Sequence, residues 1–299
     1  MKIHKAGKKG ASKMFESKTE SKTTKDILPD TQNKKDNRKI PINKVGVRNL
    51  KYPIMLKDRE ADIQHTIATI SMTVDLPKHF KGTHMSRFIE IIESKGKEIH
   101  VNSLYVILEE MQKKLDANAA HIEMEFPYFK TKTAPVTKKK SLLDYTVKFH
   151  GVIYSDKKDF IMTVKVPVTT LCPCSKSISN YGAHNQRGEV TVSVRFKDMV
   201  WIEDIISIVE ESASSELYAL LKREDEKFVT EKAYENPVFV EDLVRNVVVK
   251  LRKNNAITWY TVEAENFESI HNHNAYAVIE SDSRFNNGNE KNFIIKRYR

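Results

Sequence analysis

The sequence predicts an α+β fold in which the order strand, strand, helix, helix, strand, strand occurs twice along the chain. Two observations lead to this prediction. Segments rich in β-branched residues come in pairs, and between the pairs lie segments whose apolar residues recur at intervals of three and four. Antiparallel strands that flank a helix pair are typical of the α+β class, with the helices on one face of the sheet.

The first unit is expected to span residues 45–158. Its strand-like and helical segments lie, in order, at residues 45–56, 63–77, 84–96, 101–120, 121–132 and 142–155. The two middle segments show the helical spacing, whereas the other four have the composition of strands. Pro135 and three successive lysines mark the turn between the last two strands.

A second unit with the same order is expected at residues 159–299. Its segments lie at residues 159–171, 189–196, 201–223, 236–254, 256–268 and 274–281. At the start of its second helix, Asn236 is a candidate N-cap and Pro237 lies in the first turn, where its missing N–H costs nothing. The chain therefore has the organisation of a tandem repeat.

The basic excess of the chain lies near its N-terminus. Residues 1–44 contain thirteen Lys or Arg and five Asp or Glu, whereas the formal charge of the whole chain is +10. The segment is rich in Lys, Ser and Thr, so we expect a disordered basic tail. Such a tail could bind an acidic partner such as nucleic acid or simply be a solvating extension. A transit peptide fits less well, because those are Arg-rich and poor in acids.

Both cysteines of the chain lie in one short motif, LCPCSKSISNYGAHNQRGEV. Only Pro173 separates Cys172 from Cys174, and a disulfide between them would need a strained ring. No secretory signal and no transmembrane stretch occur, so we expect a reducing, cytoplasmic compartment and no membrane partner. Because His184 follows within the same motif, a metal site or a reactive thiol is indicated.

Two further segments are rich in metal-ligating side chains, LKREDEKFVTEKAYENPVFVEDLVR and AENFESIHNHNAYA. If the second is a strand, His271 and His273 share one face of it. Each feature also has a structural interpretation. Carboxylates in such a segment usually form a solvated helix face, a single histidine is usually a hydrogen-bonded surface residue, and a cysteine beside a proline is usually a small buried residue.

Four segments together resemble the type IB family of GTP cyclohydrolase I, namely GTHMSRF, VPVTTLCPCSKSISNYGAHNQRGEVTV, LLKREDEKFVTEKAYENPVFVEDLVR and ENFESIHNHNAYA. The resemblance implies the tunnelling fold (T-fold), in which ββααββ units form barrels, and a homotetramer with active sites at subunit interfaces. It also implies the reaction. The imidazole ring of GTP is opened, C8 leaves as formate and 7,8-dihydroneopterin triphosphate forms, as the first step of pterin and tetrahydrofolate synthesis.

The same resemblance implies one divalent metal ion per active site, zinc or manganese. Cys172, His184 and Glu226 would hold it, with His271 completing or facing the site. A bound divalent ion lowers the pKa of water to near 7, which makes hydroxide available for attack on C8. This mixed set of sulfur, nitrogen and oxygen donors leaves room for water, suits zinc and also admits manganese.

Further roles follow from the resemblance. Cys174, Glu268 and His271 are the candidate acids and bases for proton transfer at the purine and at the formamide intermediate. Glu241 matches the guanine anchor of the family, since a carboxylate can accept two adjacent N–H donors. The candidates for binding the triphosphate are Lys176, Arg187, His84 and Arg87.

Two alternatives stay open from the sequence. A related T-fold nitrile reductase forms a covalent adduct on a cysteine and takes hydride from NADPH, which would leave His184, Glu226 and His271 without a purpose. A non-enzymatic binding protein would hold a structural metal in a closed four-ligand site and bind nucleic acid through its basic tail, with strong salt dependence. Outside this tail the chain is close to neutral, so nucleic acid is not an expected partner there.

Overall fold

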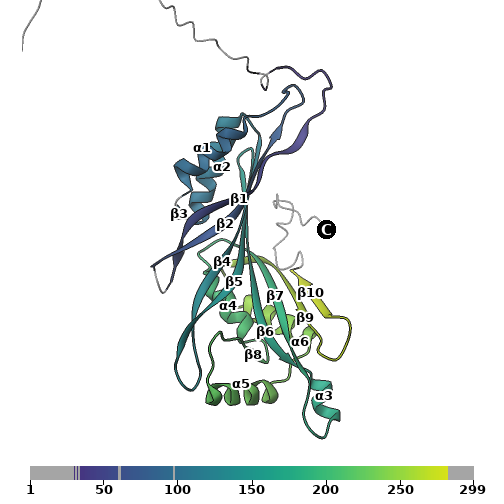
Figure 1. Cartoon of the computed structure of the whole chain (residues 1–299). Helices are drawn as coiled ribbons and strands as arrows, with labels where there is room; N and C mark the ends of the chain where they lie inside the picture. Colours follow the sequence, from purple (N-terminus) through teal and green to yellow (C-terminus); the bar gives the residue numbers. More distant parts are fainter. Residues whose placement is uncertain (1–29, 31, 33, 60–61, 97, 282–299) are drawn as a thin grey trace, which may run out of the picture.

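The structure, a computed structural model, describes residues 30, 32, 34–59, 62–96 and 98–281 (Figure 1). Residues 1–29, most of the basic tail expected at residues 1–44, lie outside the described residues. The end of the second expected unit, residues 282–299, also lies outside them. The described residues therefore cover the first unit, the second unit as far as Ser281 and a short segment before the first unit.

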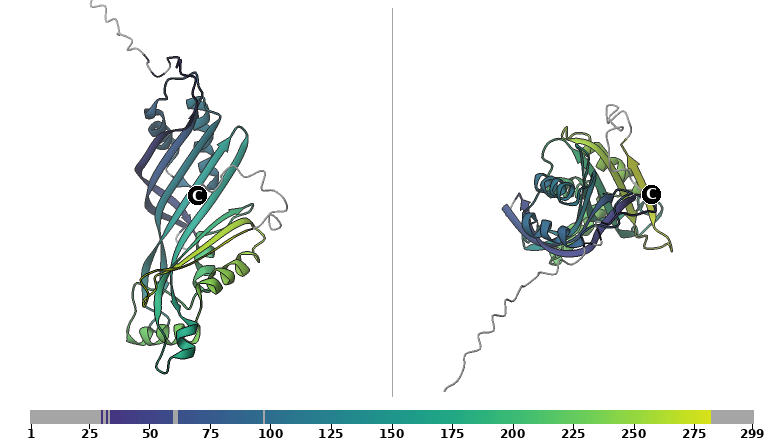
Figure 2. Two further views of the ribbon diagram at one scale, coloured as in Figure 1. Left: turned by 90° about the vertical axis from the view of Figure 1, so that its right-hand side faces the viewer. Right: turned by 90° about the horizontal axis from the view of Figure 1, so that it is seen from above.

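One sheet contains the ten strands of the described chain, which are β1 (Ile42–Asp58), β2 (Asp62–Leu76), β3 (Glu98–Ile99), β4 (Ala119–Thr133), β5 (Lys140–Tyr154), β6 (Lys157–Leu171), β7 (Asn185–Phe196), β8 (Ser215–Glu216), β9 (Ile257–Asn266) and β10 (Ala275–Glu280). Their order is β10-β9-β7-β6-β5-β4-β2-β1-β3, with β8 paired to β6. All pairs are antiparallel except β1 with β3. Figure 2 shows the long strands twisting along the molecule.

Two groups of helices pack on this sheet (Figure 1). The described helices are α1 (Met85–Lys95), α2 (Val101–Leu115), α3 (Pro173–Ile178), α4 (Ile202–Glu210), α5 (Arg223–Glu235) and α6 (Val240–Leu251). α1 and α2 contact each other, α2 contacts β2, β4 and β5, α4 contacts β6, and α6 contacts β9 and β10. Apart from the additional elements β3, α3, β8 and α5, the order is β1-β2-α1-α2-β4-β5 and then β6-β7-α4-α6-β9-β10, which confirms the predicted tandem α+β fold. None of these helices has the length and apolarity that crossing a membrane requires.

A single hydrophobic core runs through both units. One row of directly paired residues crosses five strands, because Met124 pairs with Phe149, Phe149 with Met162, Met162 with Val194 and Val194 with Tyr260. All five are buried members of one continuous cluster. Directly paired residues of antiparallel strands point to the same face of the sheet. The pairing of β5 with β6 therefore joins the two units into one continuous sheet.

The helix predicted at residues 201–223 is wrong in its second half. α4 ends at Glu210, and the short strand β8 pairs with β6 through Ser215 and Thr169. Serine side chains compete with the backbone hydrogen bonds of a helix. Here Ser214 Oγ accepts a hydrogen bond from the backbone N–H of Leu171 at 3.0 Å. The serine-rich segment that follows α4 therefore bonds to β6 instead of extending the helix.

The N-cap predicted at Asn236 is also wrong. Asn236 instead ends α5, since its backbone N–H donates to the carbonyl oxygen of Lys232 at 3.1 Å. Pro237 cannot extend α5 because it has no N–H to donate. α6 begins at Val240, with Phe239 as its N-cap. Helix α5 is thus a separate element between the two helices that the sequence predicted for the second unit.

Candidate functional site

A pocket of about 290 Å³ lies in the second unit, between the ends of the central strands and the start of α6. Its polar lining residues are Cys172, His184, Gln186, Glu241, Asn266, Glu268, His271 and His273. They come from the segment after β6, from the start of β7, from α6, and from the end of β9 and the loop after it. The structure therefore brings together parts of three segments that the sequence singled out.

The thiol of Cys172 is placed by a short network around Ser175. Cys172 is the N-cap of α3, and its Sγ accepts a hydrogen bond from the backbone N–H of Ser175 at 3.4 Å. Ser175 Oγ donates to the carbonyl oxygen of Cys172 at 3.1 Å and accepts from the backbone N–H of His184 at 3.2 Å. The backbone N–H of Cys172 in turn donates to the carbonyl oxygen of His184 at 3.1 Å. These bonds hold the two predicted donors next to each other.

The ring of His184 is oriented by Gln186. Thr170 and Gln186 are paired residues on β6 and β7, and Gln186 Nε2 donates to Thr170 Oγ1 at 2.9 Å. This bond leaves the amide oxygen of Gln186 facing His184 Nδ1 at 3.0 Å. An amide oxygen can only accept a hydrogen bond, so Nδ1 is the donor in this contact, and in the tautomer that carries its proton on Nδ1 the other ring nitrogen, Nε2, has a free lone pair. The sheet therefore presents His184 as a potential ligand.

The third side of the pocket is the loop between β9 and β10. Glu268 Oε2 lies 3.9 Å from His184 Nδ1. The rings of His271 and His273 are stacked, with centroids 5.1 Å apart and planes inclined by 17°. The prediction that these two histidines share a strand face is wrong, because both lie in the loop between the two strands. They are neighbours because the loop stacks their rings.

Asn266 and Gln186 are pocket residues that the sequence interpretation missed. Asn266 is buried, and its Oδ1 has no hydrogen-bond partner in the described part of the chain. It pairs with Gly188, where an added Cβ would come within 2.7 Å of that Oδ1. Glycine thus permits the close approach of the two strands. Both missed residues have uncharged amide side chains, which do not stand out in a sequence as metal ligands. The available signal was position, because Gln186 and Gly188 lie in the quoted cysteine and histidine motif.

Five predicted site residues line the pocket, namely Cys172, His184, Glu241, Glu268 and His271. Three others lie close in sequence to pocket residues but do not line it. Cys174 is exposed on α3, Arg187 is exposed on β7, and Lys176 Nζ donates to the carbonyl oxygen of Tyr234.

The remaining predicted residues lie elsewhere. Glu226 is exposed on α5, outside the pocket. His84 and Arg87 are at the start of α1, at the opposite end of the molecule from α3 (Figure 1). There His84 Nε2 lies 3.3 Å from a carboxylate oxygen of Asp30, and Arg87 donates to the carbonyl oxygen of Lys114 at 2.8 Å. A single chain therefore does not bring these three residues to the pocket.

The pocket has the donor types that a borderline divalent ion prefers, but one chain does not complete a donor set. Thiol, imidazole and carboxylate groups all line it. Among the described residues, however, no three His, Cys, Asp or Glu side chains lie close enough together to hold a metal ion. The types of side chain in the pocket therefore suit a metal ion, but one chain places too few of them close together to hold it.

The fold and the pocket define a tandem ββααββ protein with a thiol, imidazoles and carboxylates at the ends of its central strands. The chain belongs to the family described as "Type I GTP cyclohydrolase folE2", whose model matches residues 28–277. This confirms the family and the enzyme class predicted from the sequence. The nitrile reductase and the non-enzymatic binding protein find no support among the relatives.

Curated relatives are similar over nearly their whole length. GTP cyclohydrolase FolE2 of Geotalea uraniireducens (strain Rf4) is 58% identical over 257 residues, which are 86% of this chain and 94% of the relative. GTP cyclohydrolase FolE2 of Syntrophus aciditrophicus (strain SB) is 59% identical over 253 residues, which are 85% of this chain and 99% of the relative. Among solved structures, the match with uricase from Arthrobacter globiformis covers 80% of this chain and 92% of the uricase chain. The sequence identity is 8% and the TM-score is 0.44.

Proposed function

We propose that this chain converts GTP into 7,8-dihydroneopterin triphosphate and formate, as a GTP cyclohydrolase I in tetrahydrofolate synthesis. The observation that carries this proposal is the pocket, which unites Cys172, His184, Glu241, Glu268 and His271 in a chain of the FolE2 family. Incubation of the purified protein with GTP, with formate and the fluorescent oxidised pterin both followed, tests it. Release of both products supports the proposal, whereas unchanged GTP in the presence of every divalent ion tried contradicts it.

Guanine recognition is assigned to Glu241 and Asn266. Glu241 lies in the first turn of α6, where the positive end of the helix dipole stabilises a carboxylate. Two adjacent N–H groups of guanine can donate to such a carboxylate as a forked pair. The unpaired Oδ1 of Asn266 would accept another N–H of the substrate, because a buried acceptor without a partner is costly.

Proton transfer is assigned to the loop between β9 and β10 and to α3. Glu268 and His271 line the pocket, where either could hold or deliver a proton at a purine nitrogen. Cys174 is exposed and outside the pocket, so its proposed role requires that substrate or a second chain covers α3. Lys176 and Arg187, on α3 and β7, are the cations of this chain that we propose for the triphosphate.

A divalent ion, zinc or manganese, is part of the proposal. Cys172 and His184 would hold it from this pocket, with Glu226 and with His271 completing or facing the site. When bound, such an ion would lower the pKa of water and so supply hydroxide at neutral pH. The chain's own contribution is to hold Cys172 through Ser175 and to orient the ring of His184 through Gln186.

A homotetramer with active sites between subunits would supply what one pocket lacks. Glu226, His84 and Arg87 are on surfaces away from the pocket of their own chain. A neighbouring copy could place its own α5 or α1 against that pocket. The proposal also includes a cytoplasmic location, because Cys172 and Cys174 are free thiols that a reducing compartment would preserve.

A further inference from the structure

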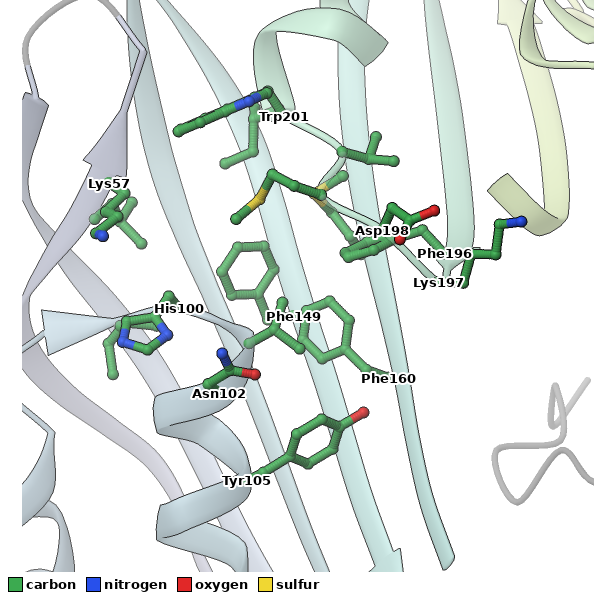
Figure 3. Close-up of a pocket in the computed structure, with 17 residues that line it drawn as sticks. Lys57, His100, Asn102, Tyr105, Phe149, Phe160, Phe196, Lys197, Asp198 and Trp201 are labelled. Carbon is green, nitrogen blue, oxygen red and sulfur yellow. The ribbon is translucent and has the colours of Figure 1, made fainter. Parts of the chain in front are cut away.

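A second and larger pocket, of about 520 Å³, lies where the two units meet (Figure 3). It is remote from the active-site pocket and shares no lining residue with it. Tyr105 of α2 and Phe149 of β5 come from the first unit, whereas Phe160 of β6, Phe196 of β7 and Trp201 before α4 come from the second. Whatever fills this pocket therefore contacts both units at once.

The lining of the pocket is predominantly apolar and includes a group of aromatic rings. Phe149, Phe160 and Phe196 form an edge-to-face series, with ring centroids 5.4 Å and 5.7 Å apart. Met199 on its rim is 62% exposed, and Trp201 borders the opening (Figure 3). Contiguous apolar surface of this kind is unfavourable in water and usually marks a place where another group binds.

The described chain ends beside this pocket. Ser281 is its last residue, and its backbone N–H donates to the carbonyl oxygen of Tyr260 at 2.9 Å. Tyr260 pairs with Val194 on β7, two residues before Phe196 in the pocket wall. From the spacing of strands and residues in a sheet, Ser281 lies roughly 12 Å from Phe196.

Residues 282–299 contain a short apolar run that suits this surface. They read DSRFNNGNEKNFIIKRYR, in which Phe293, Ile294 and Ile295 are consecutive. Phe293 is twelve residues after Ser281, and twelve extended residues reach about 40 Å, more than three times the separation from the pocket wall. The family model ends at residue 277, so this run lies outside the residues that the model matches.

We propose that Phe293, Ile294 and Ile295 of the same chain insert into the pocket between the two units. Insertion would remove from water the three side chains and the exposed groups at the opening, such as Met199. The short connection to Ser281 gives the segment a high effective concentration at its own pocket, which favours it over free ligands and other copies. The C-terminal segment would then be a strap that holds the first unit against the second.

Tryptophan fluorescence tests the proposal, because the chain has two tryptophans, Trp201 and Trp259. In a Trp259→Phe background, Trp201 is the single reporter. Truncation after Ser281 should shift its emission to longer wavelength and raise its quenching by acrylamide. Ile294→Asp should reproduce both changes in the full chain. Asn289→Asp, which adds the same charge outside the apolar run, should change neither.

Two results would overturn the proposal. Unchanged emission and quenching of Trp201 after truncation would show that the segment does not cover the pocket. Protection of Trp201 that fades as the full-length protein is diluted would show that a second copy supplies the segment. Retained GTP turnover in the truncated protein confirms that it is folded, since the active-site pocket is separate.

Discussion

Gln186 joins the buried part of the sheet to the candidate site pocket. It is buried, its amide N–H donates to Thr170, and its amide oxygen faces His184 Nδ1. Groups that hold the second nitrogen of a metal-binding imidazole commonly affect metal affinity or activity by 10- to 100-fold, as an order of magnitude. Because the contacts of its amide are with Thr170 and His184, we assign the side chain a positioning role.

Gln186→Leu should therefore lower the affinity for zinc or manganese by about 10- to 100-fold, because the ring of His184 loses the partner that fixes its tautomer. Competition with a chromophoric chelator measures this affinity without relying on turnover. Asn185→Leu, at the exposed neighbouring position of β7, is the matched control and should bind metal as the wild type does. Equal affinity in both variants would refute the role of Gln186.

At the scale of elements, Asp225 fixes the start of α5 to the turn between β4 and β5. Its carboxylate accepts hydrogen bonds from the backbone N–H groups of Val136 at 2.8 Å and Thr137 at 2.9 Å, and from Thr137 Oγ1 at 2.6 Å. It also accepts from the backbone N–H of Lys222 at 3.0 Å. Burial raises the pKa of Asp225, but these hydrogen bonds outweigh it and hold the pKa below its usual range. The neighbouring Glu226 is thereby held on the surface of α5.

Asp225→Asn should lower the free energy of unfolding at neutral pH. A carboxyl group with a lowered pKa in the folded state stabilises the protein above its unfolded pKa of about 4, and this contribution is lost as the pH falls towards the folded value. Urea unfolding should therefore show a difference from wild type that is full at pH 7 and shrinks below pH 4. Asp144→Asn, at an exposed position of β5, is the control. A difference that does not change with pH would contradict the assignment.

The strands could be predicted from the sequence because the side chains of each one alternate between the core and the opposite face. Val190, Val192 and Val194 of β7 illustrate this, since all three are buried. The last residue of α4 and the first residue of α6 could not be predicted in the same way. Ser214 bonds to a strand that is distant in sequence, and local helix signals contain no information about such a partner.

Some residues of the candidate site could likewise be predicted from the sequence, and others could not. Cys172 and His184 could be expected to meet because one motif contains both, and β6 and β7 pair directly. The contribution of Asn266 could not be predicted, because it depends on the register of β9 against β7. The separation of Glu226 from Cys172 likewise depends on the placement of α5, which no short motif specifies.

At the scale of the whole molecule, the proposed tetramer makes a prediction about shared active sites. If a neighbouring copy supplies Glu226, a Cys172→Ala chain and a Glu226→Ala chain carry defects in complementary parts of the same site. Each variant alone should be inactive, whereas tetramers that contain both should regain part of the turnover of GTP. Refolding the two variants together and separately compares these cases. Absence of any recovery in mixed tetramers would contradict a shared site.

The most direct measurement is turnover of GTP by the metal-stripped full chain, with zinc or manganese added back. Wild-type protein should release formate and form the pterin only when a metal ion is present. Cys172→Ala and His184→Ala should lose both products and bind the metal ion more weakly, whereas Asn185→Leu should retain both. Formation of both products without metal, or undiminished turnover by Cys172→Ala, would contradict the proposal that this pocket is a metal-dependent GTP cyclohydrolase site.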